Sequence, residues 1–261
     1  MSTLSYAAAD SATMLRRNLK HMLRYASMTL MLIGMPVVFL LLFVYVFGGT
    51  LGSGLGGATG GRAAYIQYVT PGILLMAVAS AAQGTAISVA MDMTEGIIAR
   101  FRIMAISRAS VLTGHVLANV VQTMLSLVIV VGVAVAIGFR SDASPMEWLA
   151  AAGVLAVITI AITWLTVALG MVSKTVEAAS NLPMPLVFLP FLGSGFVPTA
   201  SMPAALQWFA TYQPFTPMTE AVRGLLDGTP VAGSTFALAL GWSALIALAG
   251  WVVARRLYER R

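Results

Sequence analysis

Long stretches of apolar residues dominate the chain, and short segments that carry charges separate them. The uncharged runs occupy residues 27–47, 66–91, 109–139, 148–173, 178–197 and 232–254. A helix of about 20 apolar residues crosses the hydrocarbon layer of a bilayer, which is roughly 30 Å thick. The pattern therefore predicts an all-α, polytopic membrane protein with six transmembrane helices, which form one transmembrane domain over residues 27–261.

The basic residues lie unevenly on the two sides of these predicted spans. With both termini in the cytoplasm, three of the 15 basic residues, Arg62, Arg140 and Arg223, fall outside. The others fall on the cytoplasmic side: Arg16, Arg17, Lys20, Arg24, Arg100, Arg102, Arg108, Lys174, Arg255, Arg256, Arg260 and Arg261. Cytoplasmic loops of membrane proteins are enriched in Lys and Arg, so we predict that both termini are cytoplasmic.

Residues 1–26 precede the first span and mix basic with apolar side chains. Arg16, Arg17, Lys20 and Arg24 alternate with methionine and leucine at spacings that suit a helix. The segment is predicted to be a cytoplasmic amphipathic helix lying at the membrane interface. The alternative is a solvated basic tail. Because this polar segment precedes the first span, we expect no cleaved signal peptide and a first span that stays as an anchor.

Composition excludes several other classes of protein. Hydrophobic residues make up 59% of the chain and charged residues only 9%, with a mean hydropathy of +0.90. Soluble domains carry about 25% charged residues, which excludes a water-soluble fold. The net charge of +6 follows from the cytoplasmic loops, so we expect no nucleic-acid partner. The chain has no cysteine, which excludes disulfides and thiolate metal sites.

The sequence shows no recognisable catalytic motif. The nine acidic residues and two histidines form no H-E-x-x-H pattern and no carboxylate pair within one span, and no G-x-S-x-G occurs. The glycine-rich residues 48–61 lack the lysine of a P-loop, and we predict a flexible linker there. We therefore expect no catalytic, cofactor-binding or metal site in this chain, and no enzymatic activity of its own.

The third predicted span carries a polar stripe. It consists of His115, Asn119, Gln122 and Ser126, which lie on one face of a helix. Polar groups in a bilayer face other helices or a wet cavity rather than lipid. The stripe therefore indicates either interhelical hydrogen bonds or part of a substrate path.

The cytoplasmic connection after the second span has the pattern of a short amphipathic helix. Asp92 suits its N-cap, with Glu95 three positions later, and Arg100 and Arg102 suit its end. The apolar residues Ile97, Ile98 and Phe101 are spaced for insertion into the groove of a partner protein. The alternative is that this helix lies on the membrane.

The last outer connection, residues 199–229, is long and apolar. Prolines divide it, and it contains Trp208 and Tyr212. We predict two short helices that dip partway into the outer leaflet as a re-entrant hairpin; the alternative is an aromatic belt lying flat at the interface. Glu220 and Arg223 are three residues apart, which predicts a local ion pair, with a gating role as the alternative.

Several short strings occur in an order that resembles a known family. They are YVTPG at 68–72, GIIARFR at 96–102, GFVP at 195–198, MP at 202–203 and AVRGLL at 221–226. Their arrangement on six spans resembles the ABC-2 type transporter permeases, specifically the daunorubicin-resistance-like drug and antibiotic export permeases. One departure is residues 104–107, MAIS, which replace the Leu-Pro ending typical of the segment before them.

The resemblance implies a function and partners. It implies the membrane-spanning permease of an ATP-binding cassette exporter in the bacterial plasma (inner) membrane, moving an amphipathic drug, antibiotic or lipid-like substrate outward. ATP and Mg would be bound by two copies of a separate ATP-binding subunit. That subunit would dock on a coupling helix formed by Glu95, Gly96, Ile97, Ile98, Arg100, Phe101 and Arg102. A second permease chain, identical or related, would complete a substrate path lined partly by the second and fifth spans.

Two other classes of membrane protein agree less well with the residues of this chain. An ion-driven secondary transporter normally carries acidic residues at mid-membrane, and the six uncharged runs contain none. An intramembrane enzyme needs an acid, a base and a nucleophile together, and no such group is evident. The identity of the substrate does not follow from these residues.

Overall fold

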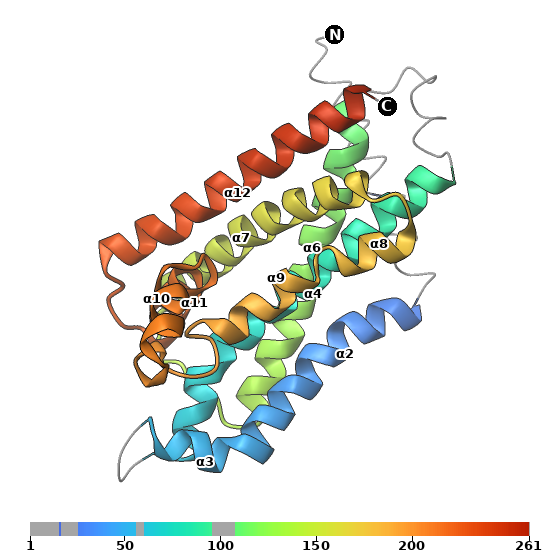
Figure 1. Cartoon of the computed structure of the whole chain (residues 1–261). Coiled ribbons are helices and arrows are strands. Elements are labelled where there is room, and N and C mark those ends of the chain that lie inside the picture. Colours follow the sequence, from blue (N-terminus) through green and yellow to red (C-terminus); the bar gives the residue numbers. More distant parts are fainter. Residues whose placement is uncertain (1–15, 17–25, 56–59, 96–107, 261) are drawn as a thin grey trace.

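The computed structural model describes residues 16, 26–55, 60–95 and 108–260, and every regular element in them is helical (Figure 1). The predicted all-α fold is confirmed for this part of the chain. The elements are α2 (Ala26–Leu42), the π-helix η1 (Phe43–Phe47), α3 (Gly48–Ser53), α4 (Arg62–Thr94), α6 (Arg108–Ala136), α7 (Pro145–Val172), α8 (Val176–Asn181), α9 (Met184–Phe188), the 3-10 helices η3 (Leu189–Leu192) and η4 (Thr199–Ser201), α10 (Ala204–Tyr212), α11 (Phe215–Asp227) and α12 (Gly233–Arg260). The predicted interfacial helix of residues 1–26 lies outside the described residues, apart from Arg16 and Ala26.

Five stretches within the described residues are long and apolar enough to cross a membrane. They correspond to the first, second, third, fourth and sixth predicted spans: Ile33–Ser53, Arg62–Thr94, Leu112–Ala136, Pro145–Val172 and Gly233–Tyr258. The protein is therefore a multi-pass membrane protein. Helix α4 extends beyond its uncharged run at both ends, α7 begins three residues before its run and α12 ends six residues after its own. A helix continues through the polar interface after it leaves the hydrocarbon layer.

The fifth predicted span, residues 178–197, is not a single helix. The chain there forms α8, a turn, α9 and η3, which together are shorter than a full span. Pro183, Pro185 and Pro190 lie in this stretch. Each proline lacks an amide hydrogen and its ring clashes with the preceding turn, so three prolines within eight positions prevent a continuous α-helix.

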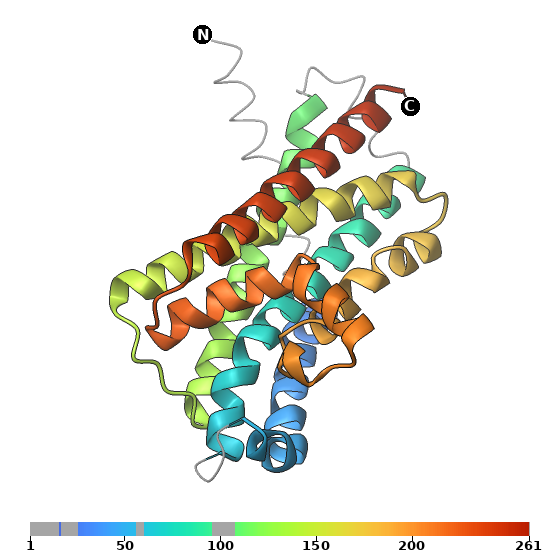
Figure 2. The same ribbon diagram turned by 60° about the vertical axis from the view of Figure 1, so that its left-hand side comes forward.

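Helices α4 and α7 form the centre of the bundle. In their most apolar stretches 72% and 67% of the residues are buried, against 22% for the first span and 17% for α12. Small residues allow the two central helices to approach closely. A Cβ atom added at Gly170 of α7 would lie 2.6 Å from the carbonyl oxygen of Ala86 in α4. The other helices surround this pair, and α12 runs beside α7 in both views (Figures 1 and 2).

The helix ends gather at two ends of the bundle. The last turn of α4, the first turn of α6 and the last turns of α7 and α12 lie toward one end, which we call the Thr94 end (Figure 1). The first turns of α4, α7 and α12, together with α3, α10 and α11, lie toward the opposite end, the Arg62 end. The predicted topology assigns the loops at the Thr94 end to the cytoplasmic side and the loops at the Arg62 end to the outer side.

The glycine-rich segment at the Arg62 end is more ordered than the sequence predicts. Residues 48–61 were expected to be a flexible linker, but Gly48–Ser53 form the helix α3. Glycine destabilises a helix by about 1 kcal/mol relative to alanine. In a bilayer, however, an unpaired backbone amide costs several kcal/mol, so continuing the helix from η1 is favoured.

Five phenylalanine rings pack the first span against η3 and the segment that follows it. Phe191 and Phe196 stack with ring centroids 4.2 Å apart, and Phe43 of η1 lies 4.7 Å from Phe196. Phe39 and Phe47 extend this cluster along the first span. Aromatic pairs at such separations contribute about 0.5–1.5 kcal/mol each beyond area burial, so the cluster holds the broken fifth segment against α2 and η1.

Candidate functional site

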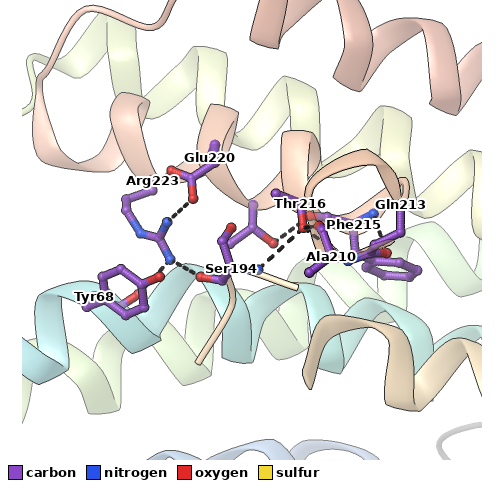
Figure 3. A network of polar contacts seen from close by, with 9 residues as sticks. Tyr68, Ser194, Ala210, Gln213, Phe215, Thr216, Glu220 and Arg223 are labelled. Atoms are coloured by element: carbon purple, nitrogen blue, oxygen red, sulfur yellow. Dashed lines mark hydrogen bonds and ion pairs between the residues drawn. The ribbon is translucent and has the colours of Figure 1, made fainter. Parts of the chain in front are cut away.

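A buried arginine at the Arg62 end joins three parts of the chain (Figure 3). Arg223 of α11 is 9% exposed, and its Nη1 donates to Oε1 of Glu220 over 2.6 Å. Its Nη2 donates to the carbonyl oxygens of Ser194, at 2.6 Å, and of Tyr68 in α4, at 3.1 Å. The predicted Glu220–Arg223 pair is therefore present, and the same guanidinium also ties α11 to α4 and to the segment after η3.

The chemistry of the guanidinium suits this position. Its planar group carries five N–H donors, and it lies 4.0 Å from the centre of the Tyr68 ring, in cation–π contact. Ser194 follows η3 in a stretch without regular hydrogen bonding, so its carbonyl oxygen needs a donor from elsewhere. Arg223 supplies that donor, and the carbonyls and the Tyr68 ring compensate for burying its charge.

A second group of polar contacts attaches the α10–α11 turn to the same segment (Figure 3). The Gln213 amide donates to the carbonyl of Leu189 at 3.3 Å and to the Thr216 hydroxyl at 3.2 Å. The Thr216 hydroxyl accepts from the backbone amide of Ser194 at 3.3 Å and donates to the carbonyl of Ala210. Helices α10 and α11 thus form one unit with residues 189–194.

Backbone contact between two glycines brings this unit onto α4. A Cβ atom added at Gly72 would lie 2.2 Å from the carbonyl oxygen of Gly195, so only glycine fits there. The Tyr65 hydroxyl donates to the carbonyl of Phe196, the residue after Gly195, at 3.2 Å. The close approach places the Ser194 carbonyl within reach of Arg223.

The end of α11 contacts the loop between α6 and α7. The Ser141 hydroxyl donates to the carbonyl of Leu226 at 2.5 Å. Gly228 has a φ of 65°, which ends α11 in the left-handed conformation, and its α-carbon faces the backbone of Asp142. Burial raises the pKa of Asp227 above its ordinary value, while Arg223 lowers it in part. Helix α11 is therefore held at its C-terminal end as well as through Arg223.

Helix α10 presents aromatic residues to the outside. Trp208 and Tyr212 are 69% and 63% exposed, and their rings lie 5.8 Å apart on one side of the helix. The two short helices predicted for residues 199–229 are thus present as α10 and α11. These exposed rings suit both a hairpin that dips into the outer leaflet and an aromatic belt lying flat at the interface.

A second buried polar cluster lies toward the Thr94 end. Nε2 of His115 in α6 lies 3.1 Å from Oδ2 of Asp92 in α4, and both residues are buried. One turn further along α6, Asn119 Nδ2 donates to the Thr163 hydroxyl of α7 over 2.7 Å. The cluster connects α4, α6 and α7 through side chains alone.

The predicted polar stripe of α6 is only partly reproduced. His115 and Asn119 bind neighbouring helices, and Ser126 is buried with no hydrogen-bond partner for its hydroxyl. Gln122 is half-buried, and the adjacent Thr123 takes the fully buried position. The geometry favours the interhelical interpretation of the stripe over the substrate path. Thr163 was missed, since a threonine on an apolar helix gives no signal by itself.

Asp92 has a different place from the one expected. The sequence suggested that it begins a separate helix as an N-cap, but α4 continues to Thr94, so Asp92 lies inside the last turns of α4. Glu95 is exposed and caps the C-terminus of α4. The other residues of the predicted coupling helix lie outside the described residues: Gly96, Ile97, Ile98, Arg100, Phe101 and Arg102.

Comparison with known proteins agrees with this architecture. A family model for ABC-2 type transporters matches residues 11–226. A daunorubicin resistance ABC transporter permease protein from Streptomyces coeruleorubidus is 30% identical over 196 residues, which cover 75% of this chain and 67% of that protein. A probable doxorubicin resistance ABC transporter permease protein from Mycobacterium tuberculosis is 26% identical over 232 residues, covering 89% of this chain and 82% of the relative.

Proposed function

The chain belongs to the ABC-2 type transporter family, and from this premise we propose that it is the membrane-spanning permease subunit of an ATP-driven exporter. The observation that carries the proposal is the family match over residues 11–226, on a multi-pass helical bundle. Members of this family are membrane subunits of transporters, and the energy would come from a separate ATP-binding subunit that holds ATP and Mg.

The proposed topology places the Thr94 end in the cytoplasm. Among the described residues, this end carries Arg108, Lys174, Arg255 and Arg256, so the orientation follows the enrichment of basic residues in cytoplasmic loops. Both termini would then be cytoplasmic in the bacterial inner membrane. The sixth crossing would be completed by the broken segment α8–α9–η3.

The broken segment also suggests where the substrate passes. Non-helical backbone at membrane depth is tolerated only where it packs on protein or lines a wet cavity. One side of this segment packs on α4 and on the phenylalanine cluster, while Leu182, Met184, Phe188 and Leu192 are exposed. We propose that this exposed side faces the second permease chain and the substrate path. Helix α4, expected to share the lining, is mostly buried within its own chain and contributes little.

The proposed substrate is an amphipathic drug, antibiotic or lipid-like molecule. Two relatives are named for resistance to daunorubicin and doxorubicin, which supports an aromatic drug as the first compound to test. Apolar and aromatic side chains such as Phe188 and Met184 suit flat amphipathic molecules, because they supply contact area without demanding a particular hydrogen-bond pattern.

Docking of the ATP-binding subunit can be tested on the predicted coupling helix. Replacing Phe101 or Arg102 by Asp should reduce co-purification with that subunit at least tenfold, because a buried carboxylate would face a groove shaped for an apolar or basic side chain. The measurement is pull-down of both subunits from membranes that contain equal amounts of the permease. Arg140→Asp, at the opposite end, serves as the matched control and should bind normally. Undiminished co-purification of Phe101→Asp and of Arg102→Asp would refute the docking assignment.

The depth of α10 in the membrane can be measured with Trp208. In a variant whose other four tryptophans are changed to Phe, we expect lipids brominated in the upper part of the acyl chain to quench Trp208 most strongly. A matched variant that keeps only Trp242, near the middle of the apolar stretch of α12, should respond most to deep bromines. A Trp208 that is quenched by aqueous acrylamide and not by brominated lipid would refute the membrane position of the hairpin.

An ion-driven secondary transporter remains the competing function. The buried acid Asp92 is paired with a histidine toward one end of α4. Transport that survives removal of the ATP-binding subunit but stops with an ionophore would establish that alternative.

A further inference from the structure

The Asp92–His115 pair joins the two helices on either side of one connection. Asp92 lies three residues before Glu95, the C-cap of α4, and His115 lies seven residues after the start of α6 at Arg108. Their side chains meet over 3.1 Å at 8% and 7% exposure. The buried contact between Asp92 and His115 therefore lies close to the end of α4 and to the start of α6.

The link is continuous with the rest of the Thr94 end. Asn119 and Thr163 add a hydrogen bond from α6 to α7. An apolar cluster packs around these contacts and includes residues of four helices: Val89, Leu112, Val116, Val167, Ala168, Met171, Ala254 and Tyr258. The ends of α4, α6, α7 and α12 consequently form one packed unit, in which the Asp92–His115 contact ties α4 directly to α6.

Local helix energetics do not explain an aspartate at this position. A negative charge near the C-terminus of a helix is opposed by the helix dipole, and Asp92 is three residues from the end of α4. Burying two polar side chains also costs desolvation that a well-packed apolar pair would avoid. What the pair provides is a directional contact with defined geometry, which fixes how α4 and α6 lie relative to each other.

We propose that Asp92 and His115 are a positioning pair that makes α4 and α6 move together when the connection between them is displaced. The inference rests on the proposed function, in which the ATP-binding subunit docks on that connection. With the pair intact, a push on the connection moves both helices, and α7 follows through Asn119 and Thr163. With the pair broken, the last turn of α4 and the first turns of α6 would yield separately, and the displacement would not reach the Arg62 end.

The test compares ATP hydrolysis with movement at the Arg62 end. Because the chain has no cysteine, a single Met146→Cys, at an exposed position in the first turn of α7, can carry an environment-sensitive dye. In the complex with the ATP-binding subunit, Asp92→Ala and His115→Ala, which remove the hydrogen bond, should leave co-purification and ATP hydrolysis within twofold of the parent. The ATP-dependent change in dye fluorescence should fall at least fivefold in both variants.

Two further variants separate positioning from general damage. The exchange Asp92→His with His115→Asp keeps the same two side chains in contact and should recover at least half of the fluorescence response. Thr94→Ala is the matched control and should behave like the parent. Among the described residues, the Thr94 hydroxyl donates to carbonyls of its own helix alone, those of Ala90 and Met91.

The outcomes are distinct. A full fluorescence response in Asp92→Ala and His115→Ala, or an exchange variant no better than the single variants, would overturn the proposal. Loss of co-purification in the single variants would overturn it as well, because the pair would then hold the docking surface and not transmit its movement. Failure of the parent chain to associate with any ATP-binding subunit would instead refute the proposed function.

Discussion

Replacing Arg223 by Ala should lower the melting temperature of the purified protein by roughly 6–15 °C. The substitution removes hydrogen bonds to the carbonyls of Ser194 and Tyr68, which lie 2.6 Å and 3.1 Å from Nη2, and leaves both acceptors without that donor. Hydrogen bonds from a charged group contribute about 1.5–3 kcal/mol each, so the expected loss is about 3–5 kcal/mol. Thermal unfolding in detergent micelles or nanodiscs measures the change.

Two further substitutions identify which part of the Arg223 network matters. Glu220→Gln removes only a partly exposed ion pair and should cost about 1 kcal/mol or less. Arg223→Lys keeps the charge but replaces the planar fork by a single ammonium, so its melting temperature should fall between those of Arg223→Ala and the parent. An Arg223→Ala protein that melts within about 1 °C of the parent would show that the network does not hold the hairpin.

Replacing Gly72 by Ala should destabilise the protein by about 3 kcal/mol, the upper end of the usual cost of overpacking. The added Cβ would lie 2.2 Å from the carbonyl oxygen of Gly195, and a backbone atom cannot rotate away as a side chain would. Helix α4 and the segment after η3 must separate, and this also weakens the bonds from Tyr65 to Phe196 and from Arg223 to Ser194. The melting temperature and the yield of monodisperse protein report the effect.

Gly153→Ala in the middle of α7 is the matched control for Gly72→Ala. A Cβ atom there would meet no other atom within 4 Å, so the same chemical change should be neutral or stabilise the protein by up to about 1 kcal/mol, through the higher helix propensity of alanine. Equal melting temperatures for Gly72→Ala and Gly153→Ala would contradict the proposed backbone contact.

The sequence predicted the long helices because hydrophobic length alone determines whether a helix can cross a bilayer. That criterion failed for residues 178–197, where Pro183, Pro185 and Pro190 break an apolar run into three helical pieces. It also failed for residues 48–53, since the cost of unpaired backbone in lipid outweighs the low helix propensity of glycine.

The candidate site was predictable only where its contacts are local. The Glu220–Arg223 pair followed from spacing along one helix, whereas the carbonyl acceptors at Tyr68 and Ser194 lie 155 and 29 residues away in sequence and carry no side-chain signal. Similarly, Asp92 and His115 are 23 residues apart, and their contact depends on how α4 and α6 pack. Tertiary packing determines which distant residues become hydrogen-bond partners. The residue pattern of a single segment carries no information about that packing.

The π-helix Phe43–Phe47 changes how the first span must be mapped. A π turn takes about one residue more than an α turn, so the side chains beyond it are shifted by about 100° around the axis. A stripe drawn along α2 at regular helical spacing therefore does not continue into α3. Cysteine-scanning data for this span should show two periodic patterns with a break in phase near Phe47, and each half needs its own assignment of the lipid-facing side.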